Sequence, residues 1–538
     1  MKRDSMGRGF AILSIASIVS KVLSVIYVPI LTRIIGDYGM GIYGKTYEIF
    51  VFVYALTNVG IQVAISKHVA ELEAVGNYKD SIKTFKMSRT IFLVIGTVFT
   101  LALMFGSHFL AEISGSSDLV YPLIFLSPTV LITTVLVTYR GYFQGRNQAK
   151  PLAVTTVIEQ VINVVLSLAC AYVLMRFGAV FGAAGGTIGT SVGALIALIY
   201  LVYIYNIYGG EREARDKQNP DIERQSNKEI FRTLLKYAIP ITLCTGLQNL
   251  GSIIDMLVVS NRLIVAGFSH KEATILFGFL STRYKSLYNV PMVFITSLGY
   301  MAMPTIARGF ALKDKKLVKD KINFALRMAY IVSVPAAFGL AILAPDLYKY
   351  LYAQTDGSGL MMVGSAIIPL MGIVLIQDVI LQSVNQFYYV LIALAIGVGV
   401  KFLCDMYLVA IPAINIYGAV IGGVLAFLTI LILNHFRMQK SLKIKISIIK
   451  LLARPLLASI CMSILIIAIK QGLGLFVNLE SLDALIGLVL LIVIVVIASF
   501  VYLCVLVYTG GLRRGDLEDI SPKIIRKLPG FLKKRLRI

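Results

Sequence analysis

The chain is divided into apolar stretches, most of which are long enough to cross a lipid bilayer. The first runs from Gly9 to Thr32 and contains a single charge, Lys21, near its middle. A helix needs about 20 predominantly apolar residues to span the hydrocarbon core. Because such stretches recur along the whole sequence, they predict an all-α polytopic membrane protein with no large soluble domain.

The composition supports this class and excludes several others. Hydrophobic residues make up 58% of the chain and charged residues 15%, with a mean hydropathy of +0.83, whereas soluble domains are about 45–50% apolar and about 25% charged. The five cysteines lie inside apolar segments without metal-ligand spacing, and the four histidines are scattered. We therefore expect no disulfide, metal site or cofactor. The first stretch continues into further spans and lacks the cleavage pattern of a signal peptide.

About fourteen transmembrane helices are predicted, and basic residues divide unequally between the two sides. The predicted spans are 9–34, 42–67, 87–111, 120–140, 152–175, 181–207, 233–262, 274–306, 322–344, 359–386, 388–411, 417–436, 449–471 and 484–509. When charges near the ends of these spans are counted with the adjacent side, 39 of the 51 Lys and Arg residues lie on the side of the termini, 7 on the other side and 5 within spans. The positive-inside rule then places both termini in the cytoplasm of a plasma-membrane protein. The net charge of +23 is explained by topology, so nucleic acid is not an expected partner.

The polar segment 208–228 divides six predicted helices from the next six. Weak matches occur in register in the two halves: "FGAAGG" with "YGAVIG", and "QGRNQ" with "QSVNQ". They predict a duplicated six-helix bundle with parallel repeats. The expected divisions are an N-terminal lobe (1–207), a cytoplasmic linker (208–228), a C-terminal lobe (229–437), helices 13 and 14 (438–509) and a basic cytoplasmic tail (510–538). The tail is expected either to lie on the anionic inner leaflet or to carry ordinary positive-inside charge.

Several predicted helices carry a stripe of polar residues on one face. Around Lys21, for example, Ser14, Ser17 and Ser24 fall within about 60° on a helical wheel. Lipid would leave such a charge unpaired, so each stripe is expected to face a water-filled cavity or another helix. From these stripes we select eight candidate substrate-binding residues: Lys21, Glu48, Gln62, Glu159, Asn163, Gln248, Asp255 and Lys285.

Predicted helix 8 carries two cations that point in different directions. Lys285 shares a polar face with Ser281 and Asn289, whereas Arg283 points about 160° away from it. Lys285 is therefore expected in the cavity and Arg283 in a packing contact. The alternative for Lys285 is an ion pair with Asp255 or Glu48, and for Lys21 an ion pair with Glu48. Lysines in a cavity suit an anionic substrate, and phosphate or pyrophosphate is the expected class.

Five motifs resemble one known superfamily. They are "SKVLSVIYVPILTRIIG", "GIYGKTYEIF", "VGIQVAISKHVAE", "YRGYFQGRNQAKPLAVTTVIEQV" and "PMVFITSLGYMAMPTIA", within a resemblance that covers residues 1–510. The chain resembles the multidrug/oligosaccharidyl-lipid/polysaccharide flippase superfamily, in the branch of stage V sporulation proteins and Gram-positive lipid II flippases. The resemblance implies two six-helix lobes around a cationic cavity, alternating access, polyprenyl-pyrophosphate-linked sugars or cell-wall precursors as substrates, and an apolar groove on helices 13 and 14.

The charged residues of that family are only partly present. Lys21 matches the position of a helix 1 arginine in the lipid II branch, but the next basic position is Tyr27 and the following acidic position is Val28. On helix 8 the arginine position falls at or beside Ser286, next to Lys285. The resemblance thus implies a cationic cavity with fewer charges, for lipid II or for another lipid-linked oligosaccharide.

Three functions can be weighed from the sequence. The first is a lipid-linked oligosaccharide flippase, and the second is a multidrug exporter of the same superfamily, which uses acidic cavity residues. The third, a membrane glycosyltransferase, lacks an Asp-x-Asp motif and a long extracytoplasmic loop, so we do not expect an enzyme. A P-loop is also absent from the sequence. Membrane potential or an ion gradient is therefore the expected energy source.

Overall fold

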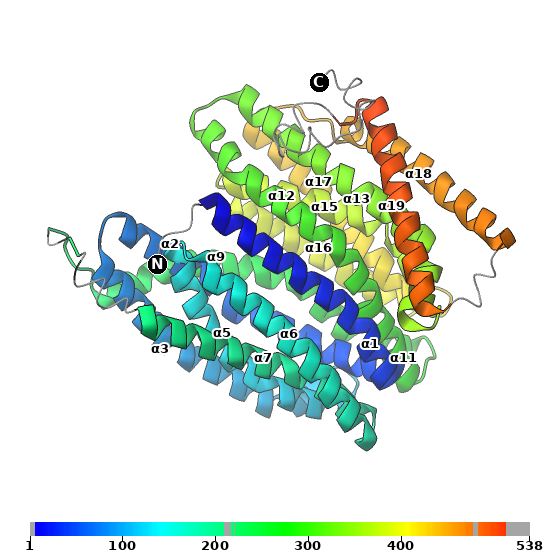
Figure 1. The fold of residues 1–538 in the computed structure, drawn as a ribbon, viewed down its shortest axis with the longest axis horizontal. Helices are drawn as coiled ribbons and strands as arrows, with labels where there is room; N and C mark the ends of the chain where they lie inside the picture. The colour runs from blue at the N-terminus through cyan, green and yellow to red at the C-terminus, as the bar shows by residue number, and fades with distance from the viewer. Residues whose placement is uncertain (1–5, 209–215, 217, 220, 477–482, 513–538) are drawn as a thin grey trace. The chain divides into compact units, whose positions relative to one another are not determined.

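The computed structural model describes residues 6–208, 216, 218–219, 221–476 and 483–512. Helices make up 89% of it, and the described residues contain no β-strand (Figure 1). The predicted all-α membrane fold is confirmed. The predicted basic tail, beyond its first residues 510–512, lies outside the described part of the chain.

The number of fourteen spans is not confirmed. Among the described residues, eleven helices are long and apolar enough to cross a membrane, or up to 12 if one bent pair counts as a single span. One of the eleven, Ile15–Ala74, is 60 residues long and covers two predicted spans. It is broken at Gly36, whose φ of 69° and ψ of 177° leave the helical region. The break separates two helices within this stretch and lies between the predicted spans 9–34 and 42–67.

The chain forms two compact units. Unit 1 consists of residues 1–283 and 405–416, and unit 2 of residues 284–404 and 417–538. The boundary at Arg283 falls inside a continuous helical segment and does not coincide with the predicted linker. The division into lobes 1–207 and 229–437 therefore stays a prediction from the internal repeat.

Unit 1 is a bundle of helices built around the first half of the chain (Figure 1). Its elements are α1 (Met6–Tyr54), η1 (Ala55–Val59), α2 (Gly60–Ala74), α3 (Tyr78–Phe105), α4 (Ser107–Ile113), η2 (Ser117–Leu119), α5 (Val120–Gly145), α6 (Ala149–Leu174), η3 (Met175–Phe177), α7 (Ala179–Tyr208), α9 (Asn227–Ile254), η4 (Asp255–Val259), α10 (Ser260–Val265), α11 (His270–Gly278) and η5 (Phe279–Tyr284). Helix α6 packs along α7, and α5 packs against α2, α3 and α7. Phe85, Tyr139, Tyr142 and Tyr205 form an aromatic core among these helices.

Three glycines of α7 allow a close helix contact within unit 1. A Cβ on Gly185, Gly189 or Gly193 would lie 2.4 to 2.7 Å from backbone atoms of α6. Small residues spaced by four let membrane helices approach closely and gain van der Waals contact. The glycine-rich segment that opens with "FGAAGG" therefore serves the tight packing of α7 on α6.

Unit 2 is built around α13 (Lys315–Tyr352). The other elements are α12 (Lys285–Ala311), α14 (Ser358–Gly364), α15 (Ile367–Ser383), α16 (Phe387–Leu408), α17 (Tyr417–Leu442), α18 (Ile448–Phe476) and α19 (Ala484–Tyr508). Helix α13 packs against α12, α15, α18 and α19. Tyr350, Met462 and Leu491 belong to the apolar core between α13 and the two C-terminal helices. These two helices, α18 and α19, correspond to predicted helices 13 and 14.

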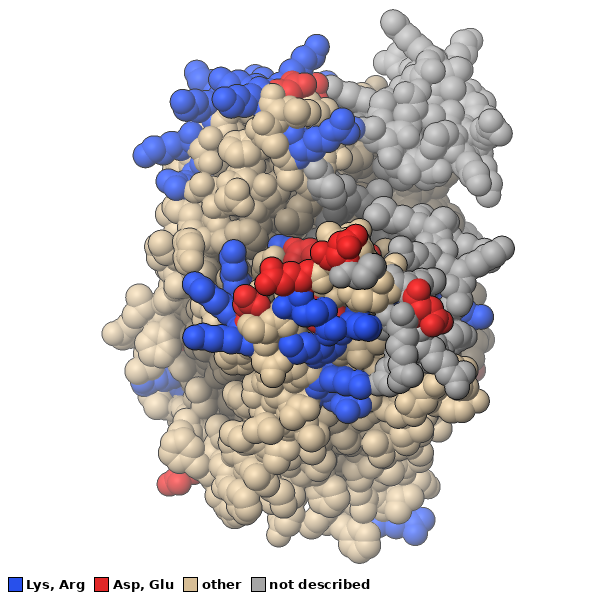
Figure 2. Space-filling view, turned by 90° about the vertical axis from the view of Figure 1, so that its left-hand side faces the viewer, with Lys and Arg blue, Asp and Glu red and all other residues tan. Residues whose placement is uncertain are grey.

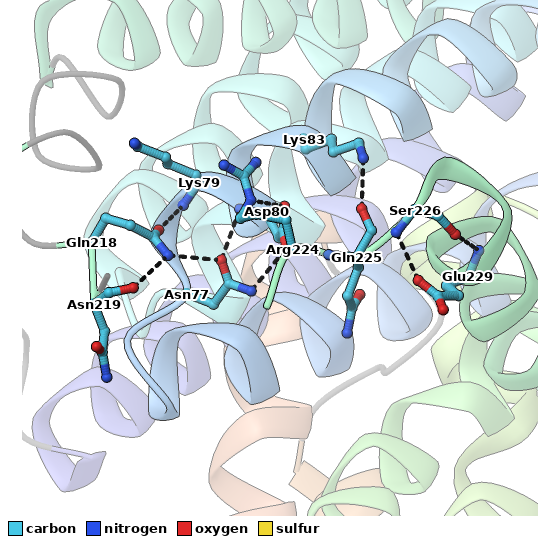
Figure 3. A network of polar contacts seen from close by, with 10 residues as sticks. All are labelled: Asn77, Lys79, Asp80, Lys83, Gln218, Asn219, Arg224, Gln225, Ser226 and Glu229. Carbon is cyan, nitrogen blue, oxygen red and sulfur yellow. Dashed lines mark hydrogen bonds and ion pairs between the residues drawn. The ribbon is translucent and has the colours of Figure 1, made fainter. Parts of the chain in front are cut away.

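The described part of the linker is bound to the turn between α2 and α3 (Figure 3). The carboxylate of Asp80, which is fully buried, accepts from Arg224 Nε at 2.6 Å, from the Gln225 backbone at 2.8 Å and from Asn77 Nδ2 at 2.8 Å. Lys83 Nζ donates to the Gln225 carbonyl at 2.6 Å. Helix α9 then begins with a capping box between Ser226 and Glu229. The described part of the predicted linker is thus fixed to unit 1.

Candidate functional site

An ion pair inside the helix bundle marks the first polar cluster of unit 1. Arg140 Nη2 on α5 lies 2.5 Å from Glu159 Oε2 on α6, and the two side chains are 13% and 26% exposed. Tyr54 of α1 lies near both charges, and Tyr47 of α1 lies near the carboxylates of Glu159 and Glu48. We call Tyr47, Glu48, Tyr54, Arg140 and Glu159 the α1–α5–α6 cluster. It contains two of the eight predicted residues, Glu48 and Glu159.

Arg140 is a residue that the sequence reasoning missed. The predicted span ended at residue 140, which placed Arg140 at a membrane surface, whereas α5 continues to Gly145. The signal was present in the "YRGYFQGRNQ" motif, because an arginine inside a membrane helix usually has a buried acidic partner. The predicted residue Glu159 is therefore the acidic partner in an ion pair with Arg140.

Aromatic side chains line one face of α1 beside this cluster. Tyr27, Tyr43, Tyr47, Phe50 and Tyr54 follow one another with ring centroids 5.6 to 6.3 Å apart. The first of them, Tyr27, is buried and donates to the Gly186 carbonyl of α7 at 2.9 Å. At the position where the resemblance expected a second basic residue, this chain therefore has a packing contact.

The other predicted residues of unit 1 lie in different environments. Gln62 Nε2 donates to Gln144 Oε1 at 2.9 Å and links α2 to the end of α5. Asn163 Oδ1 accepts from Ser167 at 3.0 Å and from Thr190 at 3.1 Å, so it contributes to the α6–α7 contact. Gln248 is exposed on α9, and Asp255 is buried at the first residue of the π-helical turn η4.

Lys21 lies on an exposed face of α1. Its neighbour Ser20 contacts the Thr156 carbonyl of α6 at 3.4 Å, while Lys21 itself makes no ion pair with any residue that the structure describes. The alternative ion pair with Glu48 is therefore not formed here. Lys285 is half-buried at the first residue of α12 and belongs to unit 2. The roles of both lysines in substrate binding stay predictions.

A second polar cluster lies where α1 meets α11, and we call it the α1–α11 contact. Arg283, which is 1% exposed, forms an ion pair with Asp37, and its guanidinium lies 4.6 Å from the Phe279 ring. The prediction that Arg283 occupies a packing position is confirmed. Lys45, also 1% exposed, lies 3.5 Å from Thr274 Oγ1. The sequence reasoning missed Lys45 because the polar-stripe analysis of the second predicted span began only at Glu48.

Glycines bring the two backbones of the α1–α11 contact together. A Cβ on Gly41 would lie 2.1 Å from the Thr274 carbonyl oxygen, and one on Gly278 would lie 2.9 Å from the Gly41 nitrogen. A side chain larger than hydrogen at either position requires the helices to move apart. Two of the three π-helical turns of the described chain, η4 and η5, lie in the segment from α9 to α12, and such turns occur frequently at functional sites.

Known proteins match the chain along most of its length. Residues 6–310 match the model of the family described as polysaccharide biosynthesis protein. The chain is 24% identical to the lipid II flippase MurJ of Bacillus subtilis over 98% of both chains. It is 26% identical to stage V sporulation protein B of the same organism, over 83% of this chain and 86% of that protein.

Solved structures share the fold. An inward closed structure of the lipid II flippase MurJ matches with a TM-score of 0.66 and 15% identity, over 91% of this chain and 97% of that one. An inward-facing multidrug resistance transporter of the MATE family matches with a TM-score of 0.65 and 15% identity, over 79% and 96%. The chain therefore belongs to the polysaccharide biosynthesis protein family, within the multidrug/oligosaccharidyl-lipid/polysaccharide superfamily.

Proposed function

We propose that this protein is a flippase that moves a polyprenyl-pyrophosphate-linked oligosaccharide or cell-wall precursor, similar to lipid II, across the plasma membrane by alternating access. The observation that carries the proposal is the match to a lipid II flippase along 98% of both chains. Catalysis is not part of the proposal, because translocation changes no covalent bond of the substrate.

The charges of unit 1 support an anionic substrate over a cationic drug. A multidrug exporter would use free acidic residues, but the Glu159 carboxylate is neutralised by Arg140. Lys21 offers an exposed ammonium on a membrane helix, where a charge is costly and usually functional. In the proposal, Lys21 and Lys285 bind the pyrophosphate. Polar groups of Gln62, Asn163 and Gln248 contact the sugar, with acidic groups of Glu48, Glu159 and Asp255 beside them.

The proposed orientation places both termini in the cytoplasm. It rests on the unequal division of Lys and Arg between the two sides of the predicted topology. In the view of Figure 2, Lys and Arg side chains gather in groups with Asp and Glu side chains among them. A reporter fused after Ile538 or within 208–228 should give a cytoplasmic signal. An extracytoplasmic signal at either place would contradict the orientation.

Membrane potential or an ion gradient is the proposed driving force. The test of function is depletion of the protein, followed by identification of the lipid-linked sugar that accumulates in the inner leaflet. If no lipid-linked sugar accumulates and the depleted cells become sensitive to cationic drugs, the exporter alternative replaces the flippase.

A further inference from the structure

A shallow basic pocket lies between the first turns of α3 and the start of α9. It has a volume of about 500 Å³. Its lining includes Lys79, Lys83, Lys86, Thr90 and the apolar Ile82 from α3, together with Asn227 from α9. The three lysines are spaced by four and three residues, so they share one face of the helix. None of the eight predicted substrate-binding residues belongs to its described lining.

Two acidic groups that the structure describes beside this pocket are engaged by other partners. The buried Asp80 carboxylate is held by Arg224, Asn77 and the Gln225 backbone, and the Glu229 carboxylate caps α9 at Ser226 (Figure 3). Lys83 donates to the Gln225 carbonyl, and the side chains of Lys79 and Lys86 are exposed at the rim. No Asp or Glu belongs to the described lining, so the pocket favours an anion.

The face of α3 that carries the lysines changes character along the helix. After Thr90 the exposed residues at helical spacing are Leu93, Thr97 and Leu101. On α9, Phe231 and Leu235 follow Asn227 on the same stripe and are also exposed. Because α3 is long and apolar enough to span the membrane, its first turns lie at the headgroup level and Leu101 lies deeper.

We propose that this pocket binds the headgroup phosphate of an anionic phospholipid, with an acyl chain lying along the apolar part of the α3 stripe. A free phosphate ion would use the lysines but not the leucines, and a neutral phospholipid would use the leucines with little benefit from the lysines. A phospholipid of the surrounding bilayer matches both parts. The bound lipid contacts α3 and the first residue of α9, next to the linker that joins the two repeats.

The absence of tryptophan from the sequence makes a direct test possible. Phe231→Trp places a single fluorophore beside the pocket, and the full-length protein is reconstituted in phosphatidylcholine vesicles. Either brominated phosphatidylglycerol or brominated phosphatidylcholine is added as quencher. Phosphatidylglycerol should be the better quencher of the Phe231→Trp variant. Phe105→Trp, at the other end of α3 and 77% exposed, should show no preference.

The lysines are tested in the Phe231→Trp background. Each lysine near the membrane surface contributes about fivefold to the affinity for an anionic lipid. The double variant Lys79→Gln/Lys86→Gln should therefore lower the affinity for phosphatidylglycerol by at most about 25-fold. Its affinities for phosphatidylglycerol and for phosphatidylcholine should then be similar. Lys83 is left unchanged because it also holds the linker. The matched control Lys315→Gln/Lys316→Gln, exposed on the first turn of α13, should keep the preference.

Three outcomes would overturn the proposal. Equal quenching of the Phe231→Trp variant by the two lipids means that the pocket has no anionic lipid. Loss of the preference in the Lys315 and Lys316 control means that general surface charge causes it. If inorganic phosphate at millimolar concentration removes the preference, the pocket is a site for free anions.

Discussion

Substitution of Gly41 by alanine should open the α1–α11 contact. The added Cβ would lie 2.1 Å from the Thr274 carbonyl oxygen, whereas ordinary contacts begin at 3.4 Å. The missing 1.3 Å (3.4 minus 2.1) cannot be gained by rotating a side chain, because the atom that clashes belongs to the backbone of α11. One of the two helices must therefore move.

The size of the effect follows from the cost of overpacking. Inserting a methyl group into a well-packed contact costs about 1–3 kcal/mol. If the protein alternates between states with and without this contact, that cost lowers the population of the contact state about 5- to 150-fold relative to the other. The ion pair between Asp37 and Arg283 and the burial of Lys45 should be lost together with the contact.

Thiol labelling measures this opening. Thr274→Cys is introduced after the five native cysteines have been replaced, and reaction with a water-soluble maleimide is followed in membranes. Thr274 is buried, so the introduced cysteine should be protected while Gly41 is present and should react in the Gly41→Ala variant. Gly399→Ala is the matched control, since no heavy atom lies within 4 Å of the Cβ that it adds. Full protection together with normal transport in the Gly41→Ala variant would refute this reasoning.

Three further predictions concern single groups. At equal expression, Lys21→Arg should keep part of the transport of lipid-linked sugar, and Lys21→Met should lose it. Full activity of the methionine variant would show that Lys21 does not bind the substrate. Arg140→Gln alone should lower stability in detergent by about 2–4 kcal/mol, because it leaves Glu159 without its ion-pair partner in a largely buried site. The double variant Arg140→Gln/Glu159→Gln should recover part of that loss, and additive losses would argue against a coupled pair. Hydrogen bonds from the Ser269 backbone and side chain lower the pKa of Glu272. The Glu272 carboxylate should therefore stabilise the N-terminal cap of α11 fully at neutral pH, and this stabilisation should be lost as the pH falls through the lowered pKa. Labelling of the cysteine introduced at position 274, expressed relative to the labelling of unfolded protein at the same pH because maleimide reacts with the thiolate, should therefore increase in acid, and Glu272→Gln should remove that increase.

The sequence was sufficient for the fold class, because a bilayer requires long apolar helices whose length can be counted. It predicted that Arg283 packs inside the protein, since a cation opposite a polar stripe needs a partner. It missed Arg140 and Lys45, because single charges near predicted helix ends look like surface residues. Their burial depends on acidic and hydroxyl partners from other helices, and pairing between distant helices leaves no periodic signal.

Helical wheels are also less reliable where a helix contains a π-helical turn. The wheel that separated Arg283 from Lys285 assumed 100° per residue, but the residues up to Tyr284 form the π-helical turn η5. A π-helical turn has more residues than an α-helical one, so the angle between neighbours is smaller. The direction of Lys285 therefore could not be read from the wheel.

The same turn determines how the chain tolerates changes in length at this point. One extra residue is accommodated within Phe279–Tyr284 in place of a regular α-helical turn. Deletion of one residue from it would leave a continuous α-helix in which the side chains of α12 keep their directions, because the wide turn has already absorbed that residue. Substitutions that force the segment into regular α-helical turns at unchanged length would instead rotate every following side chain of α12 by about 100°. The face that α12 presents can thus be changed through this turn without replacing any side chain of α12.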